Sequence, residues 1–159
     1  VLKDQDAHVD LAAELELGRR YMNIEQERLG NRLVVEWHLP DQIPHIQVPQ
    51  LLLQPLLENT IYHGIQPLLE GGKVSISLAR ITDSDEKDRR WVLMIENDKS
   101  ETVVKSEGHQ ISLPNIAMRL EAIFGEKAAL NFAQTANQYR VMVELPEYND
   151  KNHKHSDKK

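Results

Sequence analysis

Apolar residues follow two different periods along the chain. They recur at the helical spacing of three and four residues from about Leu11 to Leu29, from Leu51 to Gly64, and from Leu113 to Phe124. Other segments alternate apolar with polar residues, as half-buried strands do: 33–38, 74–79, 91–96, 129–134 and 139–145. Strands that are separated by helices but also joined by hairpins predict an α+β fold. We expect a two-layer sandwich, in which a mixed, mostly antiparallel sheet carries about three helices on one face.

The densest apolar run, LLLQPLLENTIYHG over 51–64, ends in polar residues. If the run forms one helix, Asn59 and His63 lie one turn apart on the same face, with Glu58 beside them. The apolar face would then pack on a core while the polar side chains face a cleft. A plainer interpretation stays open, in which Asn59 and His63 simply finish a helix that Gly64 caps.

The polar stretch 97–112, NDKSETVVKSEGHQIS, has no period. Loops of that length in a compact domain are usually functional lids or disordered segments. The end of the chain is charged and poor in apolar residues, so we expect a disordered tail over 147–159. With residues 1–9 as a linker, the folded domain is predicted to span 10–146.

Composition narrows the possible classes of protein. The length of 159 residues and the hydrophobic content of 40% fit one ordinary globular domain. The absence of cysteine excludes disulfides and thiolate metal sites and fits a reducing compartment. A formal net charge of −6 argues against a general nucleic-acid surface, so we expect no direct nucleic-acid partner. No apolar run approaches the ~20 residues of a bilayer span, which predicts a soluble piece. The chain starts without Met, and we expect it to be a fragment of a longer protein.

These motifs together resemble the ATP-binding domain of the GHKL superfamily. The pattern is PLLEN followed by H-G on a helix, then a strand pair, a polar loop, and a helix that opens LPNIAMRL. More closely, it resembles bacterial sensor histidine kinases of the LytS and AlgZ type, over nearly all of residues 10–146. The resemblance implies a Bergerat-type ATP-binding fold, with ATP and Mg²⁺ as cofactors.

The resemblance also assigns roles to individual residues. The family's Mg²⁺ ligand falls on Asn59, and one Asn carbonyl suffices because Mg²⁺ on a nucleotide takes only one or two protein oxygens. His63, one turn later, would meet a phosphate. Glu58 would orient or deprotonate the nucleophile, unless it makes only a structural hydrogen bond. The helix from Leu113, with Asn115 in its first turn, would offer backbone N–H groups to the same anion.

The two glycine boxes of the family have lost most of their glycines in this chain. The first, usually D-x-G-x-G, reads NDKSE from Asn97 onward and has lost both glycines. Its Asp accepts a hydrogen bond from the adenine amine. Asn97 would accept that bond as a neutral substitute, or Asp98 would if the alignment shifts by one. The second box, usually G-x-G-x-G-L, keeps only Gly108 and Leu113. Side chains in place of glycines restrict how closely a backbone wraps around phosphate.

By this resemblance the chain is the catalytic domain of a two-component sensor histidine kinase. Such a domain transfers the ATP γ-phosphate to a histidine on a separate dimerisation domain, for relay to a response regulator. An alternative is a degenerate module with weak or no ATP binding, which regulates response-regulator phosphorylation through protein contacts. A third interpretation, a hydrolytic ATPase of the chaperone or mismatch-repair kind, is disfavoured by the small size.

The family also implies partners that the chain itself lacks. None of the seven histidines has the sequence context of a phosphate-accepting histidine. We therefore expect upstream dimerisation and phosphoacceptor helices, a homodimer in the full protein, and a response regulator, with the LytTR type as one candidate. The parent would be anchored in the bacterial inner membrane, with this chain as a cytoplasmic domain.

Overall fold

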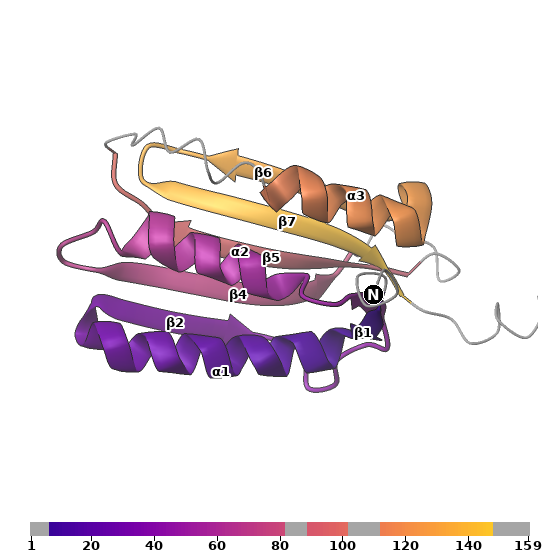
Figure 1. The fold of residues 1–159 in the computed structure, drawn as a ribbon, viewed down its shortest axis with the longest axis horizontal. Coiled ribbons are helices and arrows are strands. Elements are labelled where there is room, and N and C mark those ends of the chain that lie inside the picture. The colour runs from indigo at the N-terminus through magenta and orange to yellow at the C-terminus, as the bar shows by residue number, and fades with distance from the viewer. Residues whose placement is uncertain (1–6, 82–88, 102–111, 148–159) are drawn as a thin grey trace, which may run out of the picture.

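The computed structural model describes residues 7–81, 89–101 and 112–147. Its elements occur in the predicted order, and the three predicted helical regions are all present (Figure 1). The helical segments are α1 Leu11–Leu29, η1 Gly30–Arg32, α2 Leu53–Asn59, η2 Thr60–Ile65, α3 Ser112–Phe124 and η3 Gly125–Lys127. The strands are β1 His8–Asp10, β2 Leu33–His38, β3 Gln47–Pro49, β4 Gly72–Arg80, β5 Arg90–Asp98, β6 Ala129–Gln134 and β7 Gln138–Pro146.

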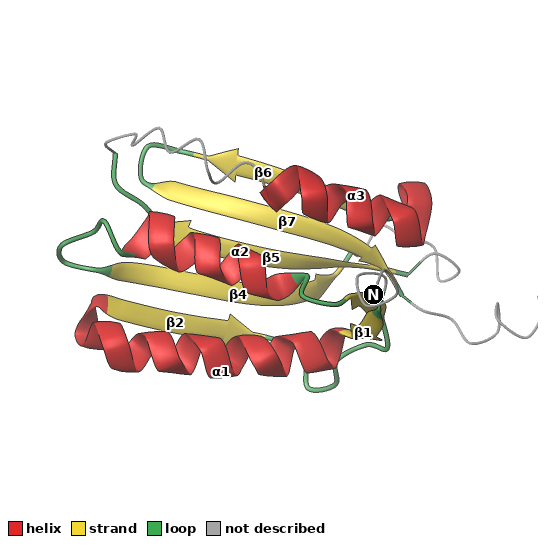
Figure 2. Cartoon of the chain, in the orientation of Figure 1, coloured by secondary structure: helices red, strands yellow, loops and turns green. Residues whose placement is uncertain are grey.

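The five longer strands form one sheet in the order β2-β4-β5-β7-β6. Strand β2 pairs parallel with β4, and every other pair in this sheet is antiparallel. The helices α1, α2 and α3 lie together on one face of the sheet (Figure 2). The predicted α+β two-layer sandwich with a mixed, mostly antiparallel sheet is therefore confirmed.

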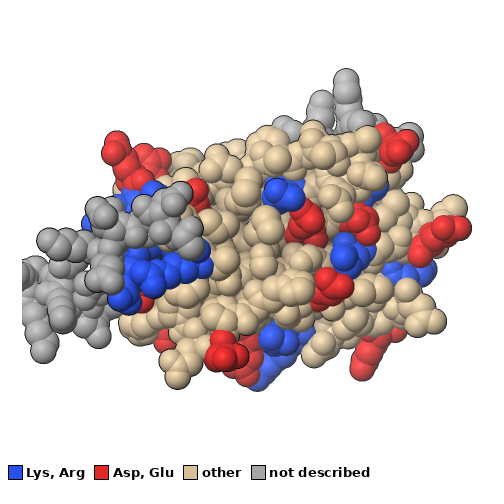
Figure 3. All heavy atoms as spheres, turned by 180° about the vertical axis from the view of Figure 1, so that it is seen from behind, with Lys and Arg blue, Asp and Glu red and all other residues tan. Residues whose placement is uncertain are grey.

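The core lies between the helices and the inner face of the sheet. Alternation places Val74, Ile76 and Leu78 of β4 inward, and each is no more than 4% exposed. The outer face, seen in Figure 3, carries ion pairs such as Arg140 with Glu96. Across the described ranges, no helix has both the length and the apolar content that a membrane crossing requires.

A small second sheet was not predicted from the sequence. Strand β1 pairs antiparallel with β3, with His8 opposite Pro49. Residues 8 and 9, assigned above to a linker, are therefore part of a strand. Three-residue strands are too short to show a period of two, and β3 lies in a connection that prolines interrupt. The remainder of the linker and the tail from 148 lie outside the described residues.

The run 51–64 is not one regular α-helix. Helix α2 starts only at Leu53, and from Thr60 the backbone continues as the π-helical segment η2. Gly64 lies inside η2, so it does not cap the helix as the plainer interpretation required. The predicted apolar face is nevertheless buried throughout, with every member at most 2% exposed: Leu52, Leu53, Leu56, Leu57 and Ile61.

A buried carboxylate from α1 holds the start of α2. Glu14 is 3% exposed, and its two oxygens accept hydrogen bonds from the backbone N–H groups of Leu51 and Leu53, at 2.9 and 3.3 Å. The N-cap residue Leu52 supplies no side-chain cap of its own. Arg119 of α3 donates to the Gln50 carbonyl in the same turn. Glu14 thus replaces a local cap and fixes where α2 begins.

We expect Glu14→Gln to lower the free energy of unfolding by about 1–2 kcal/mol. The amide keeps the size of the side chain but accepts through only one of its two terminal atoms and loses the charge that strengthens both bonds. Urea denaturation measures the change. Glu16→Gln on the exposed face of α1 is the matched control and should shift stability by less than about 0.5 kcal/mol. Equal effects of the two substitutions would contradict the capping role.

Candidate functional site

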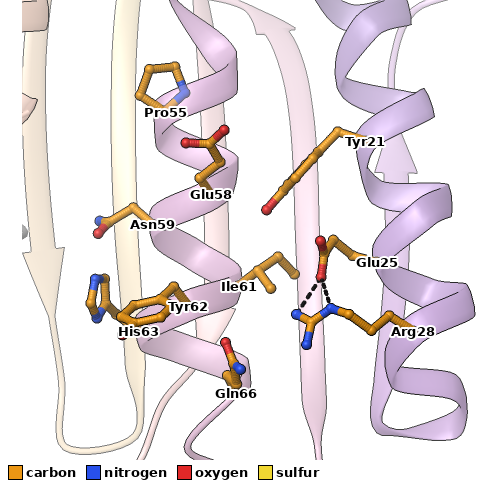
Figure 4. A pocket seen from close by; sticks show the side chains of 10 residues that line it. All are labelled: Tyr21, Glu25, Arg28, Pro55, Glu58, Asn59, Ile61, Tyr62, His63 and Gln66. Atoms are coloured by element: carbon orange, nitrogen blue, oxygen red, sulfur yellow. Dashed lines mark hydrogen bonds and ion pairs between the residues drawn. The ribbon is translucent and has the colours of Figure 1, made fainter.

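Asn59 and His63 lie where the backbone changes from α to π geometry. Asn59 is the last residue of α2 and His63 the fourth of η2, and both are half-buried. Figure 4 shows their side chains on the same side of the helix, pointing away from α1. The predicted common face is therefore present despite the π segment. Such segments in helices occur frequently at functional sites.

An open pocket of about 580 Å³ lies between α1 and the α2–η2 helix (Figure 4). Its α1 wall includes Tyr21, Glu25 and Arg28, and its other wall includes Glu58. Arg28 donates two hydrogen bonds to Glu25 there. Burial, together with the negative charges of Glu25 and Glu58, raises the pKa of Tyr21 to about 12. Its hydroxyl therefore stays protonated at neutral pH.

Glu58 faces this pocket. It is exposed, and its Oε1 accepts a hydrogen bond from Gln54 Nε2 at 3.2 Å. Figure 4 places its carboxylate between Asn59 and Tyr21 rather than beside His63. In this structure Glu58 makes the structural hydrogen bond that the sequence analysis left open, and its catalytic role stays a prediction.

Asn97 sits at the end of β5 and carries an unused acceptor. It is 3% exposed, and its Nδ2 donates to the Asp98 carbonyl at 2.9 Å. Its Oδ1 is buried without a hydrogen-bond partner among the described residues. The reversed amide would set Oδ1 against the Asp98 carbonyl oxygen, so that carbonyl fixes the orientation. A buried carbonyl oxygen without a donor is costly, so Asn97 Oδ1 has an unused capacity to accept a hydrogen bond.

Gly64 is the residue that lets η2 approach Asn97. A Cβ on Gly64 would lie 2.9 Å from Asn97 Cγ, closer than real Cβ contacts come. The glycine of the H-G motif is thus required by a contact with β5, 33 positions further along the chain. The structure in this way joins the His63–Gly64 motif to the first glycine box.

The carboxylate of Asp98, the alternative acceptor, already accepts a hydrogen bond within the domain. Its Oδ2 accepts the backbone N–H of Lys73 at 2.8 Å, at the start of β4. Between the two candidates, only Asn97 has an acceptor that is buried and unpaired. Tyr139, which the sequence analysis did not single out, lies opposite Asn97 in the neighbouring strand β7, and burial raises its pKa. Strand register is not readable from motifs, so no sequence signal pointed to Tyr139.

The remaining predicted residues are on or near α3. Leu113 is 7% exposed and packs in the hydrophobic core, so its side chain supports the helix rather than facing a ligand. Asn115 is exposed in the first turn of α3. Gly108 lies outside the described residues. Within the described part of the chain, no three His, Asp or Glu side chains gather as a metal site. Mg²⁺ on a nucleotide takes only one or two protein oxygens and does not need such a cluster, and the role of Asn59 as its ligand stays a prediction.

Comparison with known proteins identifies relatives of this chain. It is 32% identical over 148 residues to the sensor histidine kinase BtsS of Escherichia coli K12, covering 91% of this chain and 25% of BtsS. It is 29% identical over 151 residues to the sensor histidine kinase/phosphatase LytS of Staphylococcus aureus, covering 87% of this chain and 25% of LytS. The chain thus spans about a quarter of the length of the curated relatives it matches. No protein-family model matches it.

The fold is also similar to a solved structure. The catalytic domain of histidine kinase ThkA superposes with a TM-score of 0.60 at 13% identity, covering 89% of this chain and 98% of that one. At that identity the structural similarity shows only a common fold. Membership of the family is shown by the sequence relatives. The sequence relatives confirm the family resemblance inferred from the motifs, and the solved structure confirms the expected fold. The chain is a homologue of the sensor histidine kinases, LytS among them, and has the fold of histidine kinase catalytic domains.

Proposed function

We propose that this chain is the ATP-binding catalytic domain of a two-component sensor histidine kinase. One observation carries the proposal: Asn97, whose buried Oδ1 is unpaired, packs its amide against Gly64, next to the segment that presents Asn59 and His63. A nucleotide would use these groups at its two ends, the base at Asn97 and the phosphates at Asn59 and His63. The sequence relatives named as sensor histidine kinases support the same function.

Each residue has a chemical task in this proposal. Asn97 Oδ1 accepts from the exocyclic amine of adenine, whereas guanine presents an oxygen at that position and would be rejected. The Asn59 carbonyl holds Mg²⁺, which neutralises phosphate charge during transfer. His63 donates to a phosphate oxygen, and the first-turn N–H groups of α3 near Asn115 face the same anion. To act on the nucleophile, Glu58 would first release Gln54.

The partners of the whole protein are part of the proposal, because the chain covers only a quarter of its relatives. The γ-phosphate would pass to a histidine on upstream dimerisation helices of a homodimer and then to a response regulator. One candidate for this partner is a response regulator of the LytTR type. The chain would be the cytoplasmic part of a protein anchored in the bacterial inner membrane.

Calorimetric titration with a slowly hydrolysed ATP analogue, with and without Mg²⁺, tests the proposal. We expect Mg²⁺-dependent binding in the micromolar range, which corresponds to about −8 kcal/mol. The GTP analogue should bind more weakly because it lacks the amine that pairs with Asn97. Absence of binding up to millimolar concentration, in this chain and in one that includes the upstream helices, would contradict nucleotide binding.

The second candidate function is a degenerate module that acts through protein contacts. The neutral Asn97 in place of a carboxylate and the missing glycines of both boxes favour it. Such a module would keep its effect on response-regulator phosphorylation when Asn59 is replaced, whereas a kinase would lose transfer. The same substitution therefore separates the two candidates.

A further inference from the structure

Strand β6 forms an edge of the main sheet that carries no charge. Among the described strands, β6 pairs only with β7, and its sequence ALNFAQ contains neither a charged residue nor a proline. The last four residues are exposed, and Phe132 remains 55% exposed although it stacks on Tyr139. Edge strands usually carry charges, prolines or bulges that block further pairing. The opposite edge, β2, does carry the charged Glu36.

The free backbone groups of β6 can be assigned from its pairing with β7. The Thr135 N–H donates to the Gln138 carbonyl, so this pair is a hydrogen-bonded one. Hydrogen-bonded and non-hydrogen-bonded pairs alternate along an antiparallel ladder. The N–H and C=O groups of Ala133 and Asn131 therefore face β7, while those of Phe132 and Leu130 point to the open edge.

We propose that this edge pairs with β6 of a second copy of the chain, antiparallel and centred on Asn131. In that register Leu130 lies opposite Phe132 of the partner subunit and exchanges two backbone hydrogen bonds with it, and the two-fold axis repeats the pair. Ala129 lies opposite Ala133 of the partner subunit, and the two Asn131 residues face each other. The outward-facing backbone groups of Leu130 and Phe132 meet complementary ones, and these two apolar side chains meet each other.

This self-complementarity favours a second copy over an unrelated extended peptide. A shift of the pairing register by one residue, which would set Leu130 opposite Ala133 of the partner subunit, would place each strand's apolar side chains on the opposite face from those of its partner. A centre at Phe132 would set Leu130 against the polar Gln134. Of these registers, the one centred on Asn131 pairs the outward-facing backbone groups and also sets apolar Leu130 against apolar Phe132 of the partner subunit. The inference does not depend on nucleotide binding.

Single-cysteine variants test the register, because the natural chain has no cysteine. In the proposed pair the two Asn131 Cα atoms form a non-hydrogen-bonded pair about 4.5 Å apart, within reach of a disulfide. The matched control is Ala133→Cys, an equally exposed position two residues away. In the proposed pair, position 133 faces Ala129 of the partner subunit. The two cysteines at position 133 would therefore be four residues apart along the strand, or about 13 Å. Under mild oxidation we expect Asn131→Cys to form a covalent dimer at least tenfold faster than Ala133→Cys.

Sedimentation equilibrium of the cysteine-free protein measures the association itself. We expect a dimer whose dissociation constant rises at least about tenfold in Phe132→Lys. The lysine removes the apolar contact with Leu130 of the partner subunit, and the two lysines, which lie diagonally across the strand pair, repel each other. Leu69→Lys, at a site 91% exposed in a turn away from β6, controls for the added charge and should leave the constant unchanged.

Three outcomes would overturn the proposal. The first is a chain that stays monomeric up to millimolar concentration. The second is equal disulfide formation by the two cysteine variants, which would indicate a different register or interface. The third is an unchanged dissociation constant in Phe132→Lys. A dimer that shows both the Asn131 preference and the Phe132 sensitivity supports it.

Discussion

Replacing Asn59 by alanine will lower the affinity for the Mg²⁺ complex of an ATP analogue about 100-fold, or about 2.7 kcal/mol. Mg²⁺ on a nucleotide takes only one or two protein oxygens, so loss of the Asn59 carbonyl removes most of what the protein offers the metal. The helix itself should persist, because Asn59 ends α2 and its apolar neighbours Leu56 and Leu57 remain buried. Calorimetry with and without Mg²⁺ measures the loss.

A matched control separates metal binding from damage to the helix. Asn23 is exposed on α1, and Asn23→Ala, the same change of side chain, should bind the nucleotide as the natural chain does. The Mg²⁺-independent part of the binding should also survive in Asn59→Ala, because it depends on Asn97 rather than on the metal. If Asn59→Ala binds with undiminished, Mg²⁺-dependent affinity, the metal ligand lies elsewhere and the assignment of Asn59 is wrong.

Replacing Gly64 by alanine will lower the free energy of unfolding by about 3 kcal/mol, the upper end of the cost of overpacking a buried site. The new methyl group would meet the Asn97 amide, and the Asp98 carbonyl lies 3.2 Å from the same position. Neither neighbour is the free end of a flexible side chain, because both belong to the end of β5 and Asn97 is buried. Nucleotide binding should fall as well, since the displaced amide carries the proposed adenine acceptor.

A second glycine and a double substitution identify the cause of that loss. Gly125 has φ +61° and no atom within 4 Å of an added Cβ, so Gly125→Ala should cost only about 1 kcal/mol of backbone strain. Adding Asn97→Ala to Gly64→Ala should restore more than about 1 kcal/mol, because the two residues then no longer collide. Strictly additive losses in urea denaturation would show that the Gly64–Asn97 contact is not the source.

Glu14 and Gly64 hold opposite ends of the helical segment formed by α2 and η2. Glu14 fixes where α2 begins, and the contact between Gly64 and Asn97 fixes where η2 passes over β5. Asn59 and His63 lie between these two fixed points. Their positions relative to Asn97 are therefore set by contacts from α1 and β5 rather than by the helix alone. Groups that bind one ligand at two ends need such support, because errors of orientation reduce binding and transfer.

Local spacing was sufficient to predict the three helical regions, the five longer strands and part of the site. The buried faces of α1, α2, β4 and β5 follow directly from periods of 3.6 and 2, because solvent exclusion acts on each element in the same way wherever it packs. The common face of Asn59 and His63 follows from their spacing of four, which survives even in the π segment. The family resemblance came from the same motifs and is confirmed by the relatives.

Features that depend on distant partners were mispredicted or missed. The strand β1 is only three residues long and exists through its pairing with β3, some 39 positions away. Gly64 was interpreted as a possible helix cap because its true neighbour, Asn97, is remote in the sequence. No local pattern distinguishes Glu14 from the other charged residues of α1, yet it is buried against the turn before α2.

The sequence by itself determined the α+β class, the order of the elements, the composition of the core and the face shared by Asn59 and His63. The tertiary structure alone decided which acceptor is left unpaired at the end of β5, why a glycine follows His63, and which backbone groups of β6 face outward. The physical reason is that burial periodicity is a property of each segment. Hydrogen-bond satisfaction and steric fit are properties of pairs of segments, and they take a definite value only after the sheet register and the helix positions are fixed.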